Sequence, residues 1–355
     1  MRQLVILGGG YGGTMIVHEL FKGGIPADVR VVLVDRLPFQ SLKTEYYALA
    51  AGTASDYELR VPYPHHEGLT MKYGEAASID LDRRILYFAD EAEEPLFYDQ
   101  LVIALGCTDN YHNIPGAKEF SCSIQSFASV RESYMLLNNA KPYSKINIVG
   151  GGLSGVELAA ELRESRPDLN IALIDRGARL LSAFPQKVSA YVTNWFHEHE
   201  VETRSHISIT SLEQGVIHYE GGDIASDVTV WTAGIRPVEL VQNLNVPKDR
   251  QGRVVINPYH QIPDYPEVFV CGDCASLPFA PSAQAAGSQG HQIAEVLTAL
   301  WRGETPKLQP IKLRGTLGSL GKKAGFGLMG KTQVTGRVPR LLKSGVLWKS
   351  KHHWG

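Results

Sequence analysis

Two glycine-rich stretches, one in each half of the chain, have the spacing G-x-G-x-x-G. Their glycines are Gly8, Gly10 and Gly13 in the first stretch and Gly150, Gly152 and Gly155 in the second. In this pattern the first glycine permits a tight turn, the second lets a pyrophosphate approach the backbone, and the third lets a helix pack closely on a strand. The N–H groups that open the following helix then point at the phosphates. Both stretches therefore predict the binding of a dinucleotide.

Each glycine-rich stretch lies in a strand–helix–strand unit that ends on an aspartate. Apolar runs at Leu4–Leu7 and Ile146–Val149 predict the buried strands before the loops. Asp35 and Asp175 end the second strands, 22 and 20 residues beyond the last loop glycine. An acid there accepts hydrogen bonds from a ribose diol and repels a 2′-phosphate, so Asp175 favours NADH over NADPH. Arg176 opposes this preference, because an arginine at that place could hold the phosphate.

A third motif and the spacing of the units indicate the fold class. Val268–Val270 is typical of a buried strand and leads into Cys271-Gly272-Asp273-Cys274, and a helix is expected from about Ala283. The two loops lie 142 residues apart, which indicates a duplicated domain rather than a short repeat. The alternation of strands and helices predicts an α/β protein. We expect Leu37–Gly52 to be a loop over the first dinucleotide, and residues 70–106 to form antiparallel strands.

The composition is that of a globular protein with an uneven distribution of charge. No apolar run of the 355 residues approaches the roughly 20 needed to cross a bilayer, and the first strand begins too early for a secretory leader. Four cysteines are too few for a disulfide framework, so we expect a cytoplasmic protein. After Glu304 there are eleven Lys and Arg and no acid, which leaves 24 basic against 37 acidic residues, a net charge of −13, before it. The basic end is either a surface for an anionic partner, lipid or nucleic acid, or a solvated module.

Taken together, these stretches resemble the flavoproteins with two dinucleotide-binding domains, the pyridine nucleotide-disulfide oxidoreductase superfamily, and within it the type II NADH dehydrogenases. The similar stretches are Leu4–Gly13, Lys43–Gly52, Tyr98–Gly106, Ile114–Gly116, Ile148–Leu162, Trp231–Gly234, Val268–Ala275, Ala283–Gly290 and Gly315–Gly321. The resemblance implies an α/β fold with two Rossmann-like domains, as in glutathione reductase. An NAD(H)-binding domain, residues 108–237, would be inserted in an FAD-binding domain, residues 1–107 and 238–306. Residues 307–355 would form a basic C-terminal module.

The resemblance also implies roles for individual residues. FAD would bind the first unit and NADH the second. Glu157 would lie near the contact between flavin and nicotinamide, although a favourable charge in the first turn of a helix explains it almost as well. Gln284 would lie beside the isoalloxazine ring. The cofactor-binding positions expected are Gly8, Gly10, Tyr11, Gly12, Gly13, Asp35, Arg36, Lys43, Ala76, Ala104, Gly106, Gly150, Gly152, Ser154, Gly155, Asp175, Ala233, Gly234, Gly272, Asp273 and Ala283.

Two departures from the family pattern concern the electron acceptor. Family members pair two glutamines four residues apart beside the quinone, but here Gln284 is followed by Ser288, with Gln289 one residue later. One residue turns a helix by about 100°, so Gln289 is not a simple substitute. The family also commonly has other residue types at Gln40, Thr44 and Glu45, the last of which is usually apolar.

The cysteines and the C-terminus lead to further expectations. Cys271 and Cys274 form C-x-x-C, but small-residue packing explains them better than a redox role, so electrons must leave the flavin directly for an outside acceptor. A helix near the end would place Leu341, Leu342, Val346 and Trp348 on one face, with Lys349 intruding and Leu347 pointing away. Gly315–Gly321 is expected to pack on the flavin domain. The remaining histidines, including His65, His66, His352 and His353, are interpreted as surface residues, and no metal is expected.

Three functions remain open at this point. The first is an NADH:quinone oxidoreductase bound to the inner face of the cell membrane through its basic module, alone or as a homodimer, with no nucleic-acid partner. The second is a soluble NAD(P)H diaphorase that reduces another small or protein acceptor, which the departure at Ser288 favours. The third is a redox-sensing flavoprotein whose NADH-bound state matters more than its turnover.

Overall fold

The first sheet is built from strands of both ends of the chain. The computed structural model describes residues 1–352, and the sheet has the order β20-β21-β9-β1-β2-β5. Its strands are β1 (Arg2–Leu7), β2 (Val29–Asp35), β5 (Leu69–Tyr73), β9 (Gln100–Ile103), β20 (Gln261–Ile262) and β21 (Tyr265–Val270). Consecutive residues of β1 face opposite sides, and both sides are buried, as in parallel sheets. The prediction of antiparallel strands in residues 70–106 was wrong for β5, which pairs in parallel with β2, and for β9, which pairs in parallel with β1 and β21.

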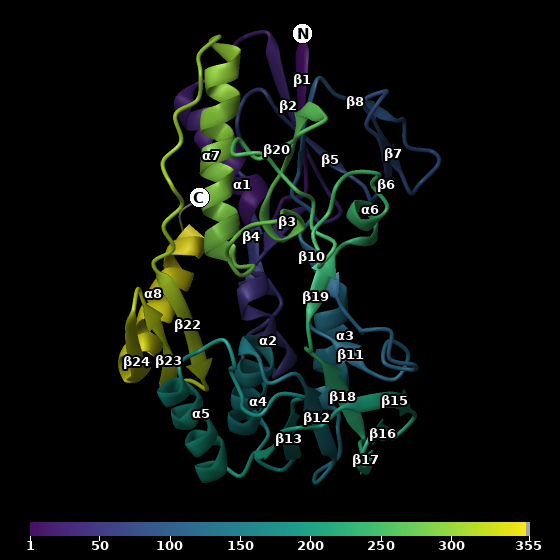
Figure 1. The fold of residues 1–355 in the computed structure, drawn as a ribbon, viewed down its shortest axis with the longest axis vertical. Helices are drawn as coiled ribbons and strands as arrows, with labels where there is room; N and C mark the ends of the chain where they lie inside the picture. The colour runs from purple at the N-terminus through teal and green to yellow at the C-terminus, as the bar shows by residue number, and fades with distance from the viewer. Residues whose placement is uncertain (353–355) are drawn as a thin grey trace.

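Helices cover one face of this sheet and a small antiparallel sheet covers the other. Leu4 and Ile6 pack with α1 (Tyr11–Gly23) and α7 (Ala283–Trp301), which lie side by side in Figure 1. Val5 and Leu7 belong to a second cluster, with residues of β6 (Ala76–Asp80) and β7 (Ile85–Phe88), and β8 (Leu96–Phe97) completes that sheet.

The second sheet repeats the arrangement in the other half of the molecule (Figure 1). Its order is β11-β18-β12-β13-β14, and all its pairings are parallel. The strands are β11 (Cys122–Ser123), β12 (Lys145–Val149), β13 (Asn170–Ile174), β14 (Glu202–Arg204) and β18 (Val228–Trp231). Around them lie α3 (Phe127–Asn138), α4 (Leu153–Ser165), α5 (Gln186–Glu198) and a hairpin sheet of β15 (Ile209–Glu213), β16 (Val216–Tyr219) and β17 (Gly222–Ala225).

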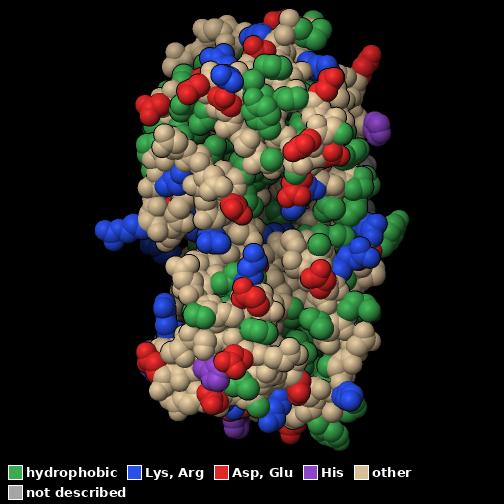
Figure 2. All heavy atoms as spheres, turned by 90° about the vertical axis from the view of Figure 1, so that its right-hand side faces the viewer, with side chains coloured by type: hydrophobic (Ala, Val, Ile, Leu, Met, Phe, Trp, Pro, Cys, Tyr) green, Lys and Arg blue, Asp and Glu red, His purple; other side chains and the backbone are tan. Residues whose placement is uncertain are grey.

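The chain crosses between the two sheets along an antiparallel pair of short strands. These are β10 (Cys107–Asp109) and β19 (Ile235–Pro237), after which α6 (Glu239–Gln242) and the turn η3 (Gly272–Cys274) belong again to the first half. The second unit is therefore inserted within the first, as the predicted fold class requires. On the face drawn in Figure 2, acidic and basic side chains are interspersed over both halves.

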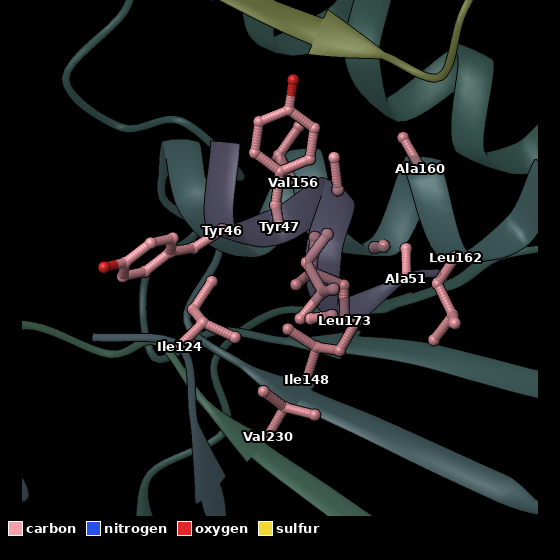
Figure 3. Close-up of a cluster of buried hydrophobic side chains, with 14 of the residues drawn as sticks. Tyr46, Tyr47, Ala51, Ile124, Ile148, Val156, Ala160, Leu162, Leu173 and Val230 are labelled. Carbon is pink, nitrogen blue, oxygen red and sulfur yellow. The ribbon is translucent and has the colours of Figure 1, made fainter. Parts of the chain in front are cut away.

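The segment predicted to be a loop over the first dinucleotide contains secondary structure. It forms β3 (Phe39–Ser41), the turn η1 (Lys43–Glu45) and α2 (Tyr46–Ala50), followed by η2 (Tyr57–Leu59) and β4 (Arg60–Pro62), which pairs with β3. Helix α2 is buried throughout and packs on α3 and α4 of the second unit. Tyr46, Tyr47 and Ala51 belong to the same buried cluster as Ile148 and Val156, which Figure 3 draws. Burial of this apolar helix joins the two units.

The C-terminal module is a three-stranded antiparallel sheet with one helix. Its elements are β22 (Gly315–Leu320), β23 (Ala324–Met329), β24 (Thr332–Gly336) and α8 (Arg337–His352). Gly315–Gly321 was predicted to pack on the flavin domain, but its main partner is a different one. Strand β22 packs chiefly on α4 of the second unit. The contact is close there, because a Cβ on Gly318 would lie 2.7 Å from Leu153 Cδ1. None of the helices in residues 1–352 is long and apolar enough to span a membrane.

Helix α8 has the predicted apolar face. Val338, Leu341, Leu342, Val346 and Trp348 are all exposed, and we call them the apolar face of α8. Leu347 points away from it, as expected, and packs against the buried core. The side chain of Lys349 and the whole of His353 lie outside the described residues.

Candidate functional site

The two glycine loops have nearly the same backbone geometry. Gly8 and Gly150 have φ angles of +109° and +114°, which favour glycine. A Cβ on Gly13 would lie 1.9 Å from the Gly8 oxygen, and one on Gly155 would lie 2.0 Å from the Gly150 oxygen. Since real atoms cannot approach so closely, the third glycine is required in both loops for helix and strand to pack.

The space above each loop fits a diphosphate. A Cβ on Gly10 or on Gly152 would meet no atom within 4 Å, so the middle glycine faces open space. These two residues are also the N-caps of α1 and α4, and neither helix has a side-chain cap. The first N–H groups of both helices are thus available to an anion, at the positive end of a helix dipole. The residues present fit a dinucleotide in each unit.

Asp35 and Asp175 accept hydrogen bonds from the backbone of the two loops. Asp35 Oδ2 accepts the Gly9 N–H at 2.7 Å, and Asp175 Oδ2 accepts the Gly151 N–H at 2.6 Å. The other carboxylate oxygen of each accepts a second backbone N–H. Because each carboxylate oxygen has two lone pairs, both aspartates can still accept a ribose hydroxyl.

Polar residues from three elements meet beside the first loop. The Cys107 thiol donates to Asp273 Oδ2, with 3.0 Å between the atoms, and Lys43 Nζ donates to the Cys107 carbonyl at 3.2 Å. Burial raises the pKa of Cys107 to about 12, so the thiol stays a neutral donor. A Cβ on Gly8 would lie 2.5 Å from the Ala104 oxygen, so only glycine allows this approach. The fold thus brings together the predicted residues Gly8, Lys43, Ala104 and Asp273.

A buried charged cluster lies between both units and the C-terminal module. Glu157 Oε1 on α4 forms an ion pair with Lys343 Nζ of α8 and accepts the Ser319 N–H at 2.8 Å. Lys343 Nζ also donates to the Tyr47 hydroxyl at 3.1 Å and lies 3.8 Å from Glu45 Oε1. Tyr47 OH in turn donates to Glu45 Oε2 at 3.2 Å. We call these five residues the Glu157 cluster.

The cluster holds two carboxyl groups against one ammonium. Burial raises the pKa of Glu157 and of Glu45, and Lys343 opposes it in both. Burial lowers the pKa of Lys343, but Glu157, Tyr47 and Glu45 outweigh it and raise the pKa. Lys343 therefore stays charged and pairs with Glu157, which it contacts more closely. The two carboxyl groups thus share the charge of one ammonium.

The glutamines of α7 have separate roles. Gln284 Oε1 accepts the Arg314 N–H at 3.1 Å, which leaves its amide NH₂ as a donor. Gln289 is fully buried and accepts the Gly272 N–H at 2.7 Å, so it does not occupy the place of a second acceptor-binding glutamine. This agrees with the expectation from helical geometry.

Other predicted residues lie at the edges of the two units. Arg36 pairs at the surface with Glu75 at 3.4 Å, and Ala76 opens β6. Ala233 and Gly234 follow β18 at the carboxyl edge of the second sheet. The cofactor atoms that these residues contact stay a prediction.

The four cysteines are free thiols. Burial raises the pKa of Cys271 to about 12 and that of Cys274 further, and the Cys274 thiol donates to the Gly106 carbonyl at 3.0 Å. Buried, protonated thiols are poor nucleophiles, which supports the packing interpretation of the C-x-x-C motif.

Sequence reasoning missed two residues. Lys343 was counted only as one charge of a basic end, and nothing local predicts that it reaches Glu157. His260 was grouped with surface histidines, and this was wrong: it is 5% exposed and bonded to Gln292. The local signal available for His260 was its position directly before the short strand β20.

Comparisons with known proteins agree with this geometry. The family model described as pyridine nucleotide-disulphide oxidoreductase matches residues 2–290. The NADH dehydrogenase-like protein YutJ of Bacillus subtilis is 52% identical, with all of both chains covered. A type II NADH:quinone oxidoreductase of Haemophilus influenzae is 27% identical over 96% of this chain and 89% of its own.

Among solved structures, NDH2 of Plasmodium falciparum, determined in complex with NADH, has the same fold. It superimposes with a TM-score of 0.86 at 16% identity, covering 99% of this chain and 96% of that one. The chain belongs to the pyridine nucleotide-disulphide oxidoreductase family and is an FAD-dependent oxidoreductase that uses NADH.

Proposed function

We propose that the protein oxidises NADH and passes two electrons, by way of FAD, to a quinone. The first loop would hold FAD, with Asp35, Lys43 and Asp273 around it, and the second would hold NADH, with Asp175 on its ribose. FAD, when bound, accepts a hydride from NADH and supplies two electrons to the acceptor. The similarity to an NADH dehydrogenase-like protein and to a type II NADH:quinone oxidoreductase supports this function.

The observation that carries the proposal is the Glu157 cluster. Reduction of a quinone to a hydroquinone consumes two protons as well as two electrons. Glu45 and Glu157 share one Lys343 charge at the junction of the two units, so the cluster can hold a proton there. Gln284 would donate its amide N–H to a quinone carbonyl, because its oxygen is already bonded to Arg314.

The state of the cysteines also favours transfer of electrons directly from FAD to an outside acceptor. All four cysteines are free, and none of them pairs with another. The departure at Ser288 favours a second candidate, a soluble diaphorase, because the acceptor would lose one of two glutamine donors. The two candidates differ in the acceptor alone.

Anaerobic stopped-flow absorbance separates these functions. NADH should bleach the flavin, and a naphthoquinone or benzoquinone should reoxidise it faster than a soluble dye at equal concentration. Fast reoxidation by dyes with slow reoxidation by every quinone would establish the diaphorase instead. Slow reoxidation by all acceptors would support a redox sensor.

The apolar face of α8 and the basic residues around it would attach the protein to an anionic membrane. Each basic residue near such a surface contributes on the order of 1 kcal/mol, so a few suffice for reversible binding. Binding to anionic vesicles should occur at low salt and weaken near the ionic strength where the Debye length is about 8 Å.

Replacement of Leu341 and Leu342 by Gln tests this attachment and leaves Lys343 in place. The double variant should lose vesicle binding and quinone turnover while keeping dye reduction. The matched control is Tyr143→Gln, which replaces an exposed aromatic residue outside the C-terminal module. Unchanged vesicle binding by the double variant would show that the apolar face of α8 does not attach the protein to the membrane.

A further inference from the structure

A chain of buried and partly buried hydrogen bonds begins at the turn that carries Asp273 and ends at Gln309, in the segment that follows α7. Gly272 N–H donates to Gln289 Oε1 at 2.7 Å, and Gln289 Nε2 lies 3.3 Å from His260 Nδ1. His260 Nε2 lies 2.8 Å from Gln292 Oε1, and Gln292 Nε2 donates to the Gln309 carbonyl. His260, Gln289 and Gln292 are 5%, 0% and 8% exposed.

The two ends of the chain fix the direction of every bond in it. Gly272 N–H can only donate, so the Gln289 amide must turn its oxygen to Gly272 and its NH₂ to His260. His260 Nδ1 must then accept, and Nε2 must carry the proton that it donates to Gln292. The carbonyl of Gln309 can only accept, which agrees with the same orientation of Gln292. Imidazole in the neutral Nε2–H form is the single state that satisfies all four bonds.

A protonated His260 would break this chain. Its Nδ1–H would face the NH₂ of Gln289, and a flip of that amide would turn NH₂ towards the Gly272 N–H. Either arrangement leaves two donors facing each other in a buried place, which is costly. Burial lowers the pKa of His260, and the bond with Gln292 opposes this, so the neutral form is the stable one at neutral pH.

The charged groups of the neighbouring elements lie outside this chain. Glu19 of α1 and Glu295 of α7 flank the exposed His291 at 3.2 and 3.4 Å, in a surface groove that Lys307 also lines. On the strand side, Cys271 is a neutral thiol bonded to the Ala286 carbonyl. His260 is also held by its own backbone, which has φ +64° and accepts the Val270 N–H at 2.9 Å.

We propose that His260 is a positioning residue for FAD: in its neutral Nε2–H form it fixes Gln289, which holds the Gly272–Asp273 turn beside the first loop. Glycine populates positive and negative φ about equally, so the bond to Gln289 helps to hold Gly272 at its φ of +74°. Gln289 occupies the Gly272 N–H, and under this proposal the contact of the turn with FAD falls to Asp273, whose carboxylate accepts from the Cys107 thiol. The inference rests on the proposed assignment of FAD to the first unit.

The tautomer of His260 is measured without reference to the cofactor. In holoenzyme labelled with ¹⁵N-histidine, the His260→Asn variant identifies the two ring resonances by their disappearance. We expect the wild-type pattern of a neutral Nε2–H ring at pH 7. A neutral Nδ1–H ring or a charged ring would overturn the proposed direction of the chain, whatever the first loop binds.

FAD release from the holoenzyme tests the positioning role. The appearance of free-flavin fluorescence after dilution gives the rate. His260→Leu, which makes no bond to Gln289, should release FAD about tenfold faster at pH 7, the effect of one lost buried hydrogen bond. His260→Asn keeps an acceptor for Gln289 and suits a positive φ, so its rate should return towards that of the wild type.

The pH profile distinguishes positioning from general destabilisation. Wild-type release should accelerate as pH falls below about 6.5, the ordinary pKa of histidine, while both variants should show a flatter profile. His291→Asn, exposed on α7 between Gln289 and Gln292, is the matched control and should keep the wild-type rate and profile. His260→Leu and His260→Asn with wild-type rates and profiles would overturn the proposal. Loss of FAD from Gly152→Val but not from Gly10→Val would instead refute the assignment of FAD to the first unit.

Discussion

The two glycine loops make nearly the same backbone contacts, but the helices that follow them pack on different elements. Residues at equal distance from the third glycine are Met15 in α1 and Glu157 in α4. Met15 packs on α7, where a Cβ on Gly290 would lie 3.0 Å from the Met15 Cβ. Glu157 instead meets Lys343 and Ser319 of the C-terminal module. The loop therefore determines that a dinucleotide binds, whereas the second turn of the helix determines which neighbouring element packs on it.

The same contrast holds at the residue just before the third glycine of each loop. Gly12 must be small because a Cβ there would lie 2.5 Å from Cys271 Sγ, whereas the equivalent Ser154 is exposed. The first helix is therefore enclosed by β21 and α7, while the second leaves its first turn open. An open first turn suits NADH, which must enter and leave in each cycle, and an enclosed one suits a retained FAD.

Among the variants that distinguish the two units, Lys343→Met is expected to have the largest effect, a loss of folding stability. It leaves Glu45 and Glu157 buried without a cation, a change that typically costs about 3–5 kcal/mol of unfolding free energy. Chemical denaturation at pH 7 measures it. Lys343→Arg should recover much of the loss, and the exposed Lys331→Met should change stability by less than about 0.5 kcal/mol.

The deficit of Lys343→Met should shrink in acid. Burial holds the pKa of both carboxyl groups above the unfolded value, so the folded state binds their protons more tightly. Their contribution to stability is then largest at low pH and is lost as pH rises through the folded pKa. Without the ammonium these pKa values rise further. A deficit that stays the same from pH 7 to pH 5 would contradict the ion-pair account.

A smaller effect is expected from the aspartates below the loops. Asp175→Asn removes the charge that repels a 2′-phosphate, so the preference for NADH over NADPH should narrow by about tenfold, with Arg176 favouring the phosphate. Flavin reduction by each cofactor in stopped flow gives the ratio. Asp35→Asn, the same change in the first unit, should weaken FAD retention and leave that ratio as it was.

The parts predicted from the sequence are those that local patterns determine. The loops, their flanking strands and the terminal aspartates follow from glycine geometry and apolar periodicity, and all of them form as expected. The interior position of Gln289 follows from helical geometry once α7 is placed. The position of its partner His260 does not, because the pairing depends on how the turn before β20 meets α7, 29 residues further along the chain.

The Glu157 cluster could not be predicted for the same reason. Glu45, Glu157 and Lys343 come from three segments separated by more than a hundred residues each, and a basic run gives no sign of which lysine will be buried. The loop expected over the first dinucleotide became α2 because its apolar residues find a surface on the second unit, which local pattern does not reveal.

The most direct test of the central claim, that two equivalent loops bind different dinucleotides, is the pair Gly10→Val and Gly152→Val. A Cβ at either position meets no atom of the protein, so both variants should fold and only the diphosphate should be blocked. The measurement is the visible spectrum of each purified variant, before and after NADH. Gly10→Val should be colourless, and Gly152→Val should be yellow and unbleached by NADH but bleached by dithionite. A yellow Gly10→Val with full FAD, or a Gly152→Val reduced by NADH at the wild-type rate, would contradict the account.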